Sequence, residues 1–288
     1  GQVIFSEDLT PRERFEEGLV ELNGVRKAIK RPFAAERERL AKLDLTEDDY
    51  RFFVEECYRA GTEPMLTVFT RRRIPLVKHL PWRGKSLIKV ASYDCGSLVL
   101  LKELVASFDR LIVSTGATFD DEVSAASEVL KNSGRPYGML HCVTSYPNAL
   151  SMCNLARMNW LRNFAPEVGW SDHTLVSRDG TKAAKIAMML GADYIERHFT
   201  VLPADATKDG LVSITPSLLA ELASFNRLSR AEQKAAVESD IPEWPLLLGQ
   251  ADREMTHAEI LNRDYYRGRF ASHVDGRWVM NWEDEAMA

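Results

Sequence analysis

The sequence predicts an α/β fold in which parallel strands alternate with helices and close into a (β/α)8 barrel. From residue 46 onward, short β-rich runs alternate with amphipathic stretches, which is typical of a parallel sheet with crossover helices. Polar residues gather at the ends of nearly all the strands, as expected when those ends meet at one rim of a barrel. An open, doubly wound sheet also fits the alternation, but neither a GxGxxG motif nor a P-loop is present to mark a nucleotide crevice.

The elements are expected in a regular order. A helix is predicted at 46–61, because Thr46 can cap its start with Asp49 three residues later and Gly61 can end it. Strands are then predicted, from their apolar and β-branched runs, at 64–69, 86–92, 110–116, 137–146, 168–174 and 193–199. Helices are predicted, from their amphipathic periodicity, at 97–108, 119–132, 154–164, 181–192 and 216–225.

Charge and cysteine content argue against several classes of protein. The formal net charge is −5 and basic residues are scattered among acidic ones, which argues against a nucleic-acid-binding surface. The one dense basic cluster, at 70–75, is expected to be a solvated helix start. The cysteines lack CxxC spacing, no apolar signal stretch is seen, and no apolar run approaches the roughly 20 residues of a membrane span. We therefore expect a cytoplasmic protein with no membrane or nucleic-acid partner.

Histidines end two neighbouring predicted strands. His173 could be a metal ligand, a general base or a structural residue, and a lone histidine at a strand end is more often structural. Residues two apart on a strand share a face. Three such pairs occur, namely Thr144 with Tyr146, Ser171 with His173, and Glu196 with His198. Two imidazoles that point into one space favour a divalent metal site with positions left for substrate.

Hydroxyl groups and one lysine lie at the other strand ends. Lys89 is the only lysine among the strand-end residues, and it supplies a fixed positive charge. The hydroxyls come from Thr67, Ser92, Ser114 and Ser171. Together these donors suit a phosphate or carboxylate, although each hydroxyl alone is better explained by turn or cap chemistry.

Six motifs in a fixed order give the sequence a family resemblance. They are KVASYD (89–94), IVSTGAT (112–118), LHCVTSYP (140–147), GWSDHT (169–174), IERHFT (195–200) and KDGLVSITPSLL (208–219). In this order the chain resembles the N-acetylneuraminic (sialic) acid synthase family over residues 2–228. The resemblance implies a TIM barrel and a transferase of sialic acid biosynthesis. Such an enzyme condenses phosphoenolpyruvate with an N-acyl hexosamine, such as N-acetylmannosamine, and releases phosphate.

The resemblance also implies roles for individual residues. A divalent metal, manganese or magnesium, is expected on His173 and His198, and catalytic roles on Lys89, Asp94 and His198. Phosphoenolpyruvate is expected to be bound by Thr67, Lys89, Ser92, Ser114, Thr144 and Ser171. The sugar is expected to be bound by Gln2, Tyr146 and Asp209. A homodimer is expected as the assembly.

The chain departs from the family pattern at several positions. Asp94 stands where Glu is usual, and Thr144 where Ser or Asn is usual. We expect residues 1–228 to be an N-terminally incomplete barrel that lacks the first strand and most of the second, with about 50 further residues upstream in the native protein. Residues 229–288 are expected to be an extension, a remnant of the connection to an antifreeze-like domain that is absent.

An insertion after the second strand is also expected. Residues 10–45 are predicted to form this insertion as helix, with Phe15, Leu19, Leu22, Val25 and Ile29 as its apolar positions.

Two alternatives to this function stay open. One is a synthase that acts on another acyl sugar, of legionaminic, pseudaminic or spore-coat type. The other, suggested by the missing strands and by Asp94, is a non-catalytic barrel that binds sugar or pairs with an active homologue.

Overall fold

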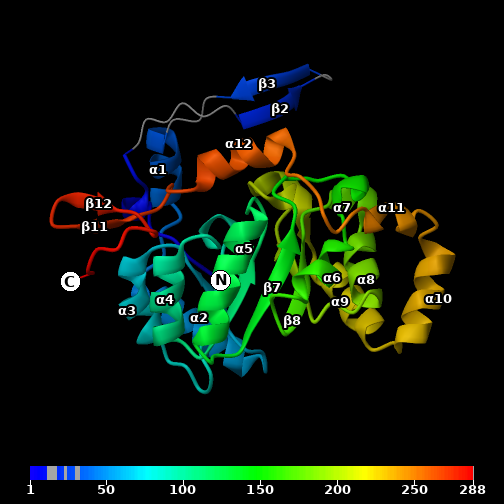
Figure 1. Cartoon of the computed structure of the whole chain (residues 1–288), viewed down its shortest axis with the longest axis horizontal. Coiled ribbons are helices and arrows are strands. Elements are labelled where there is room, and N and C mark those ends of the chain that lie inside the picture. Colours follow the sequence, from blue (N-terminus) through cyan, green and yellow to red (C-terminus); the bar gives the residue numbers. More distant parts are fainter. Residues whose placement is uncertain (12–17, 23–24, 30–32, 288) are drawn as a thin grey trace. The chain divides into compact units, whose positions relative to one another are not determined.

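The computed structural model describes residues 1–11, 18–22, 25–29 and 33–287. The chain divides into two compact units, of which the first comprises Gly1–Tyr137 with Ile260–Ala288 and the second Gly138–Glu259. Each unit is built on parallel strands with helices, and Figure 1 labels most of the helices together with strands β2, β3, β7, β8, β11 and β12. None of the described helices is long and apolar enough to span a bilayer.

The first unit contains a parallel sheet in the order β1-β4-β5-β6. Its strands are β1 (Gln2–Val3), β4 (Met65–Val68), β5 (Leu87–Val90) and β6 (Arg110–Ser114), with the antiparallel pairs β2 (Gly18–Leu22) with β3 (Val25–Ile29) and β11 (Ser272–Val274) with β12 (Arg277–Val279). Its helices are α1 (Phe33–Ala41), α2 (Glu47–Arg59), α3 (Ile74–Lys78), α4 (Leu98–Ser107), α5 (Asp120–Asn132) and, from a start in the other unit, α12 (His257–Tyr266). Short 3-10 turns include η1 (Ser6–Asp8), η2 (Arg71–Arg73) and η3 (Ser92–Asp94).

The second unit contains a parallel sheet in the order β7-β8-β9-β10. The strands are β7 (Tyr137–Cys142), whose first residue belongs to the other unit, β8 (Glu167–Asp172), β9 (Tyr194–Phe199) and β10 (Ser213–Ile214). The helices are α6 (Arg157–Leu161), α7 (Val176–Asp179), α8 (Lys182–Met189), α9 (Pro216–Asn226), α10 (Arg230–Asp240) and α11 (Trp244–Leu248). Further 3-10 turns are η4 (Leu150–Met152), η5 (Ala204–Ala206) and η6 (Gly210–Val212).

Alternation along the strands separates a polar face of each sheet from an apolar one. In β5, Ile88 and Val90 are fully buried on the face opposite Lys89, while the adjoining α4 buries Leu100 and Leu104. In the second unit, α8 packs against β8 and buries an apolar stripe that includes Ala183, Ala184, Ile186 and Ala187. Helices thus cover apolar faces, and polar side chains on the opposite faces are left available for function.

The predicted strands are confirmed within a few residues, and so is the start of α2. Thr46 Oγ1 accepts the Asp49 N–H at 3.2 Å, and Asp49 Oδ2 accepts the Thr46 N–H at 2.8 Å, which completes a capping box. The helix predicted at 154–164 is shorter, since α6 has only five residues. β10 was not predicted.

The predicted helical insertion at 10–45 is wrong over most of its described part. Residues 18–29 contain the antiparallel pair β2–β3, with Leu19 opposite Ala28 and Leu22 opposite Val25, and only α1 is helical. The apolar spacing of this segment is compatible with a helix or with two short strands, and in the structure the two strands pair with each other. Phe15 lies outside the described residues.

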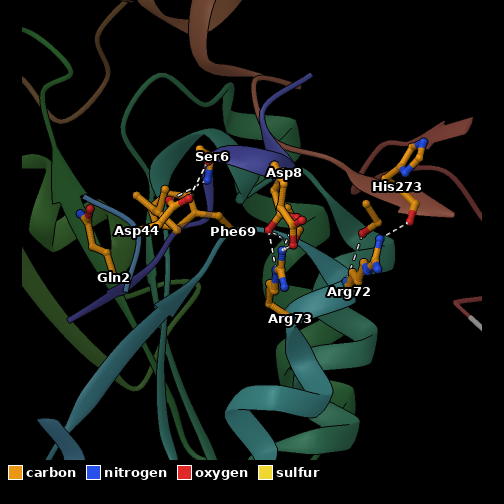
Figure 2. A network of polar contacts seen from close by, with 12 residues as sticks. Gln2, Ser6, Asp8, Asp44, Phe69, Arg72, Arg73 and His273 are labelled. Carbon is orange, nitrogen blue, oxygen red and sulfur yellow. Dashed lines mark hydrogen bonds and ion pairs between the residues drawn. The ribbon is translucent and has the colours of Figure 1, made fainter. Parts of the chain in front are cut away.

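The basic cluster at 70–75 is not a solvated helix start. Arg71 and Arg73 have side chains that are 2% and 12% exposed. Arg73 donates from Nε to Asp8 Oδ2 at 2.7 Å and from Nη2 to Asp8 Oδ1 at 2.8 Å, and Figure 2 shows this bidentate pair beside Arg72 and His273. Burial raises the pKa of the Asp8 carboxyl, and the bonds from Arg73 oppose this shift. The arginines that follow β4 therefore bind segments that are distant in sequence, at Asp8 and His273.

Candidate functional site

Four predicted binding residues of the first unit, Gln2, Thr67, Lys89 and Ser114, lie on one face of its sheet. In the parallel register, Gln2 is opposite Thr67, and Thr67 is opposite Lys89. Residues that are opposite one another in a parallel sheet point to the same side. Ser114 lies two residues beyond Ile112, which is opposite Lys89, so it shares that side. We call Gln2, Thr67, Lys89, Ser92, Asp94 and Ser114 the lysine group.

Lys89 is the charge at the centre of the lysine group. Its residue is 6% exposed, and Nζ donates to Ser114 Oγ at 2.7 Å and to the Val90 carbonyl at 3.2 Å. Thr67 and Ser92 are also buried, whereas Gln2 is exposed. A buried ammonium among hydroxyls is suited to a small, highly charged anion, because it offers charge-assisted hydrogen bonds at low dielectric.

Asp94 is the carboxylate of the lysine group, at the end of η3. Its Oδ1 accepts hydrogen bonds from Asn281 Nδ2 at 2.8 Å and from Ser97 Oγ at 3.3 Å. Burial raises the pKa of the Asp94 carboxyl to about 6, and the bonds from Asn281 and Ser97 oppose this shift. A carboxyl group with a pKa near 6 can accept and return a proton close to neutral pH.

The second unit brings together three aromatic rings. The ring centroids of Tyr146 and His173 are 4.1 Å apart, those of His173 and His198 are 5.3 Å apart, and those of Tyr146 and His198 are 6.0 Å apart. Asp209 Oδ2 lies 3.9 Å from His198 Nδ1. We call Tyr146, Ser171, His173, Glu196, His198 and Asp209 the histidine group. The predicted sugar residues Tyr146 and Asp209 therefore lie beside the predicted metal ligands.

Register explains how the histidine group is held. Ser171 is opposite Glu196 in neighbouring strands, and Ser171 Oγ donates to Glu196 Oε1 at 2.6 Å. Cys142, opposite Ser171 in β7, places its Sγ 3.9 Å from His173 Nδ1, and both residues are buried. The contacts of Glu196 with Ser171 and of Cys142 with His173 were not predicted. The position of both residues at strand ends could have indicated that they belong to the site. Thr144, two residues beyond Cys142, is fully buried.

An ion pair supports the same strands from the opposite face. Asp172 Oδ2 lies 2.5 Å from Arg197 Nη1, and the two side chains are 0% and 4% exposed. Asp172 Oδ1 also accepts the Thr174 N–H and hydroxyl at 2.9 and 2.8 Å, while Arg197 Nη1 donates to Thr174 Oγ1 at 3.1 Å. Because Asp172 and Thr174 flank His173, this network fixes the backbone that carries the imidazole.

The geometry of the two histidines is compatible with a shared divalent ion. An ion bound by imidazole lies roughly 3 Å from the ring centre, since metal–nitrogen bonds are about 2.1 Å long. Two such ion-to-ring distances add up to slightly more than the 5.3 Å between the ring centroids of His173 and His198, so one ion can contact both rings. Across the part of the chain that the structure describes, no group of three or more His, Cys, Asp or Glu could hold a metal. The pair would therefore leave the remaining positions to substrate or water, as a Lewis-acid site requires.

A comparison with family models identifies a family for this chain. The model described as the NeuB family matches residues 26–237, which is more than half of the chain. The matched range includes every predicted site residue except Gln2.

Curated relatives and solved structures are similar to the same region. An N,N'-diacetyllegionaminic acid synthase of Legionella pneumophila is 31% identical over 83% of this chain and 65% of its own. The spore coat polysaccharide biosynthesis protein SpsE of Bacillus subtilis is 32% identical over 65% of this chain and 50% of its own. The crystal structure of an N-acetylneuraminic acid (sialic acid) synthetase of Leptospira borgpetersenii has a TM-score of 0.61 at 23% identity, covering 80% of this chain and 74% of that one. The chain spans about half to two thirds of the length of the curated relatives that it matches.

Proposed function

Since the chain belongs to the NeuB family, we propose that it is a synthase that condenses phosphoenolpyruvate with the open-chain aldehyde of an N-acyl hexosamine. The observation that carries the proposal is the composition of the two groups. One holds a buried lysine among hydroxyls, and the other holds two histidines beside a tyrosine and a carboxylate. The first suits an anionic substrate and the second a polar sugar, which is the pair of substrates that this reaction joins.

The lysine group would bind phosphoenolpyruvate. Lys89 would compensate its negative charge, and the hydroxyls of Thr67, Ser92 and Ser114 would donate to its phosphate or carboxylate oxygens. We further assign Thr144 and Ser171 to this substrate. In the reaction, C3 of phosphoenolpyruvate forms a bond to the aldehyde carbon, whose oxygen gains a proton. Water then adds at the former C2, and phosphate leaves.

The histidine group would bind the sugar. A manganese or magnesium ion on His173 and His198 would polarise the aldehyde oxygen. Tyr146 and Asp209 would orient the sugar hydroxyls, and Gln2 is also assigned to sugar binding. Asp94, with its pKa near 6, would hold or move a proton during addition of water. The homodimer stays a prediction.

The proposal is tested by phosphate release. The full-length native protein is incubated with phosphoenolpyruvate, manganese and a panel of hexosamines that includes N-acetylmannosamine and the precursors of legionaminic, pseudaminic and spore-coat sugars. Release with one sugar, together with a nine-carbon acid product in mass spectra, would support the synthase and identify its acceptor. A folded protein that releases no phosphate with any sugar would instead favour a non-catalytic, sugar-binding or partner-pairing role.

The metal assignment has a separate test. His173→Ala should abolish metal-dependent phosphate release, because a single imidazole cannot retain the ion. It should also weaken manganese binding, followed by electron paramagnetic resonance, by about tenfold or more, the scale for loss of one support of a metal site. His79→Ala, which changes an exposed histidine of the first unit, is the matched control. Unchanged manganese affinity in His173→Ala would show that the ion is bound elsewhere.

A further inference from the structure

Asn281 lies on the segment that follows β12, and it contacts the lysine group. The residue is 3% exposed. Its side-chain Nδ2 donates to Asp94 Oδ1 at 2.8 Å and to the main-chain carbonyl of Phe69 at 2.9 Å. The main-chain carbonyl of Asn281 accepts the Leu100 N–H at 3.1 Å. We propose that Asn281 is a positioning residue that holds the Asp94 carboxylate in its reactive orientation. This proposal rests on the proposed function.

The Phe69 carbonyl fixes the direction of the Asn281 amide. A carbonyl oxygen only accepts hydrogen bonds, so the NH2 end of the amide must face Phe69 and the same nitrogen must face Asp94. Turning the amide over would place its oxygen against the Phe69 oxygen. Asn281 therefore presents Asp94 with a donor and no acceptor, and a donor favours the ionised carboxylate.

The segment that carries Asn281 is itself firmly attached. Arg71 donates from Nη1 to the Glu283 carbonyl at 2.5 Å and from Nη2 to the Glu285 carbonyl at 2.6 Å. The Glu283 carboxylate closes the turn by accepting the Met280 N–H at 2.8 Å. Upstream, the Arg72 N–H donates to Ser272 Oγ at 3.0 Å, and Arg72 Nη1 donates to the His273 carbonyl at 2.6 Å, as Figure 2 shows. The buried Arg71 and the exposed Arg72 thus hold this segment in place on both sides of Asn281.

The surroundings of Asp94 make the contribution of Asn281 measurable. Burial opposes ionisation of Asp94, while Asn281, Ser97 and the charge of Arg267 favour it, in that order. The bond from Ser97 is longer, at 3.3 Å, and it reaches the same oxygen as the bond from Asn281. Among the described residues, Asn281 therefore makes the shorter of the two hydrogen bonds to this carboxylate.

The test follows ionisation of Asp94 directly. In the full chain labelled with 13C, the Asp94 carboxyl is titrated by NMR and is assigned with Asp94→Asn. Asn281→Leu should raise the pKa of Asp94 by about one pH unit, the scale for loss of one hydrogen bond to a charged group. Ser97→Ala, the matched control, should raise it less. An unchanged titration in a folded Asn281→Leu protein would overturn the proposal, whatever the activity.

The kinetic readout links this position to the reaction. If Asp94 acts ionised, the acid limb of kcat in Asn281→Leu should move upward with its pKa, so that kcat at pH 6 falls about fivefold. KM for phosphoenolpyruvate should change little. Asn281→Ser, which keeps one donor, should recover part of the loss and serves as the test if the leucine variant does not fold. A wild type without activity would refute the proposed function alone, because the titration still decides the role of Asn281.

Discussion

The lysine group and the histidine group are each built on four parallel strands of their own unit, but their side chains are held in different ways. In the histidine group the partners are opposite one another in adjacent strands, as in Ser171 with Glu196, and the supporting pair Asp172 with Arg197 follows the same rule. In the lysine group, Asp94 depends on Asn281, which lies 187 residues further along the chain. Strand register therefore places side chains in both groups, and docking of a distant segment completes the lysine group.

The two arrangements should respond differently to substitution. Where two buried side chains pair across adjacent strands, removal of one leaves the other buried without its partner. The expected effect is a lower free energy of unfolding. Where the partner comes from a distant segment, as Asn281 does for Asp94, its removal leaves the strands unaffected. The expected effect is a change in the pKa of the carboxyl group. Three predictions follow this difference, from the largest expected effect to the smallest.

The largest effect is expected at the buried ion pair of the second unit. Arg197→Met should lower the free energy of unfolding by about 3–5 kcal/mol, because it leaves Asp172 as an uncompensated buried charge. Urea unfolding followed by circular dichroism measures this. The double variant Arg197→Met with Asp172→Asn should recover much of the loss, since no buried charge then remains. A loss below 1 kcal/mol in the single variant would mean that register pairing contributes little here.

A smaller effect is expected at the charge of the lysine group. Lys89→Met should weaken binding of phosphoenolpyruvate by about 2–4 kcal/mol, the scale for loss of one partner of a desolvated charge pair. Sugar binding should change little. Isothermal calorimetry measures both ligands, and Lys102→Met, on the exposed side of α4, is the control. Equal losses for the two ligands would show that Lys89 is structural.

The smallest effect concerns Asp94 and pH. Because the folded-state pKa is raised to about 6 from an ordinary 3.8, this group stabilises the fold below about pH 4 and loses that contribution as pH rises through 6. Asp94→Asn should therefore gain about 2–3 kcal/mol relative to wild type between pH 4 and 7, at about 1.4 kcal/mol per unit.

A second aspartate provides a control of opposite sign for the pH prediction. Asp109 has a pKa lowered by hydrogen bonds from Ser86, so its contribution is present above its unfolded pKa and is lost as pH falls. Thermal unfolding of Asp94→Asn and Asp109→Asn is compared from about pH 2 to pH 7, because the contribution of Asp109 is lost only below its unfolded pKa of 3.8. A pH profile of Asp94→Asn that parallels that of wild type would contradict the raised pKa.

The strands and the histidine group were predictable because both depend on local sequence pattern. Apolar and β-branched runs locate β4 to β9 within a few residues, and the two-residue period of a strand places Ser171 with His173 and Glu196 with His198. The pairing of β2 with β3 also had a signal that went unused. Asn23 and Gly24, between the two strands in the sequence, form the dipeptide that most favours a two-residue hairpin.

The attachments of the first unit could not be predicted, because they join segments far apart in sequence. Nothing in the TRRRIP string indicates that Arg71 binds carbonyls at 283 and 285, and an arginine cluster is ordinarily solvated. Asn281 lies in no recognisable motif. β10, with two residues, is too short for any periodicity to reveal.

The first unit is made of two stretches of the chain, 1–137 and 260–288, and this affects the order in which the protein folds during translation. The second unit is one uninterrupted stretch, Gly138–Glu259, and its register-paired contacts are available as soon as its strands leave the ribosome. Asp94 must wait for a partner made 187 residues later. At about 5–20 residues per second, that delay is roughly 10–40 s, during which a carboxylate destined for the interior lacks its amide donor. The nascent chain is therefore expected to complete its middle first, and to bury Asp94 as one of its last folding events.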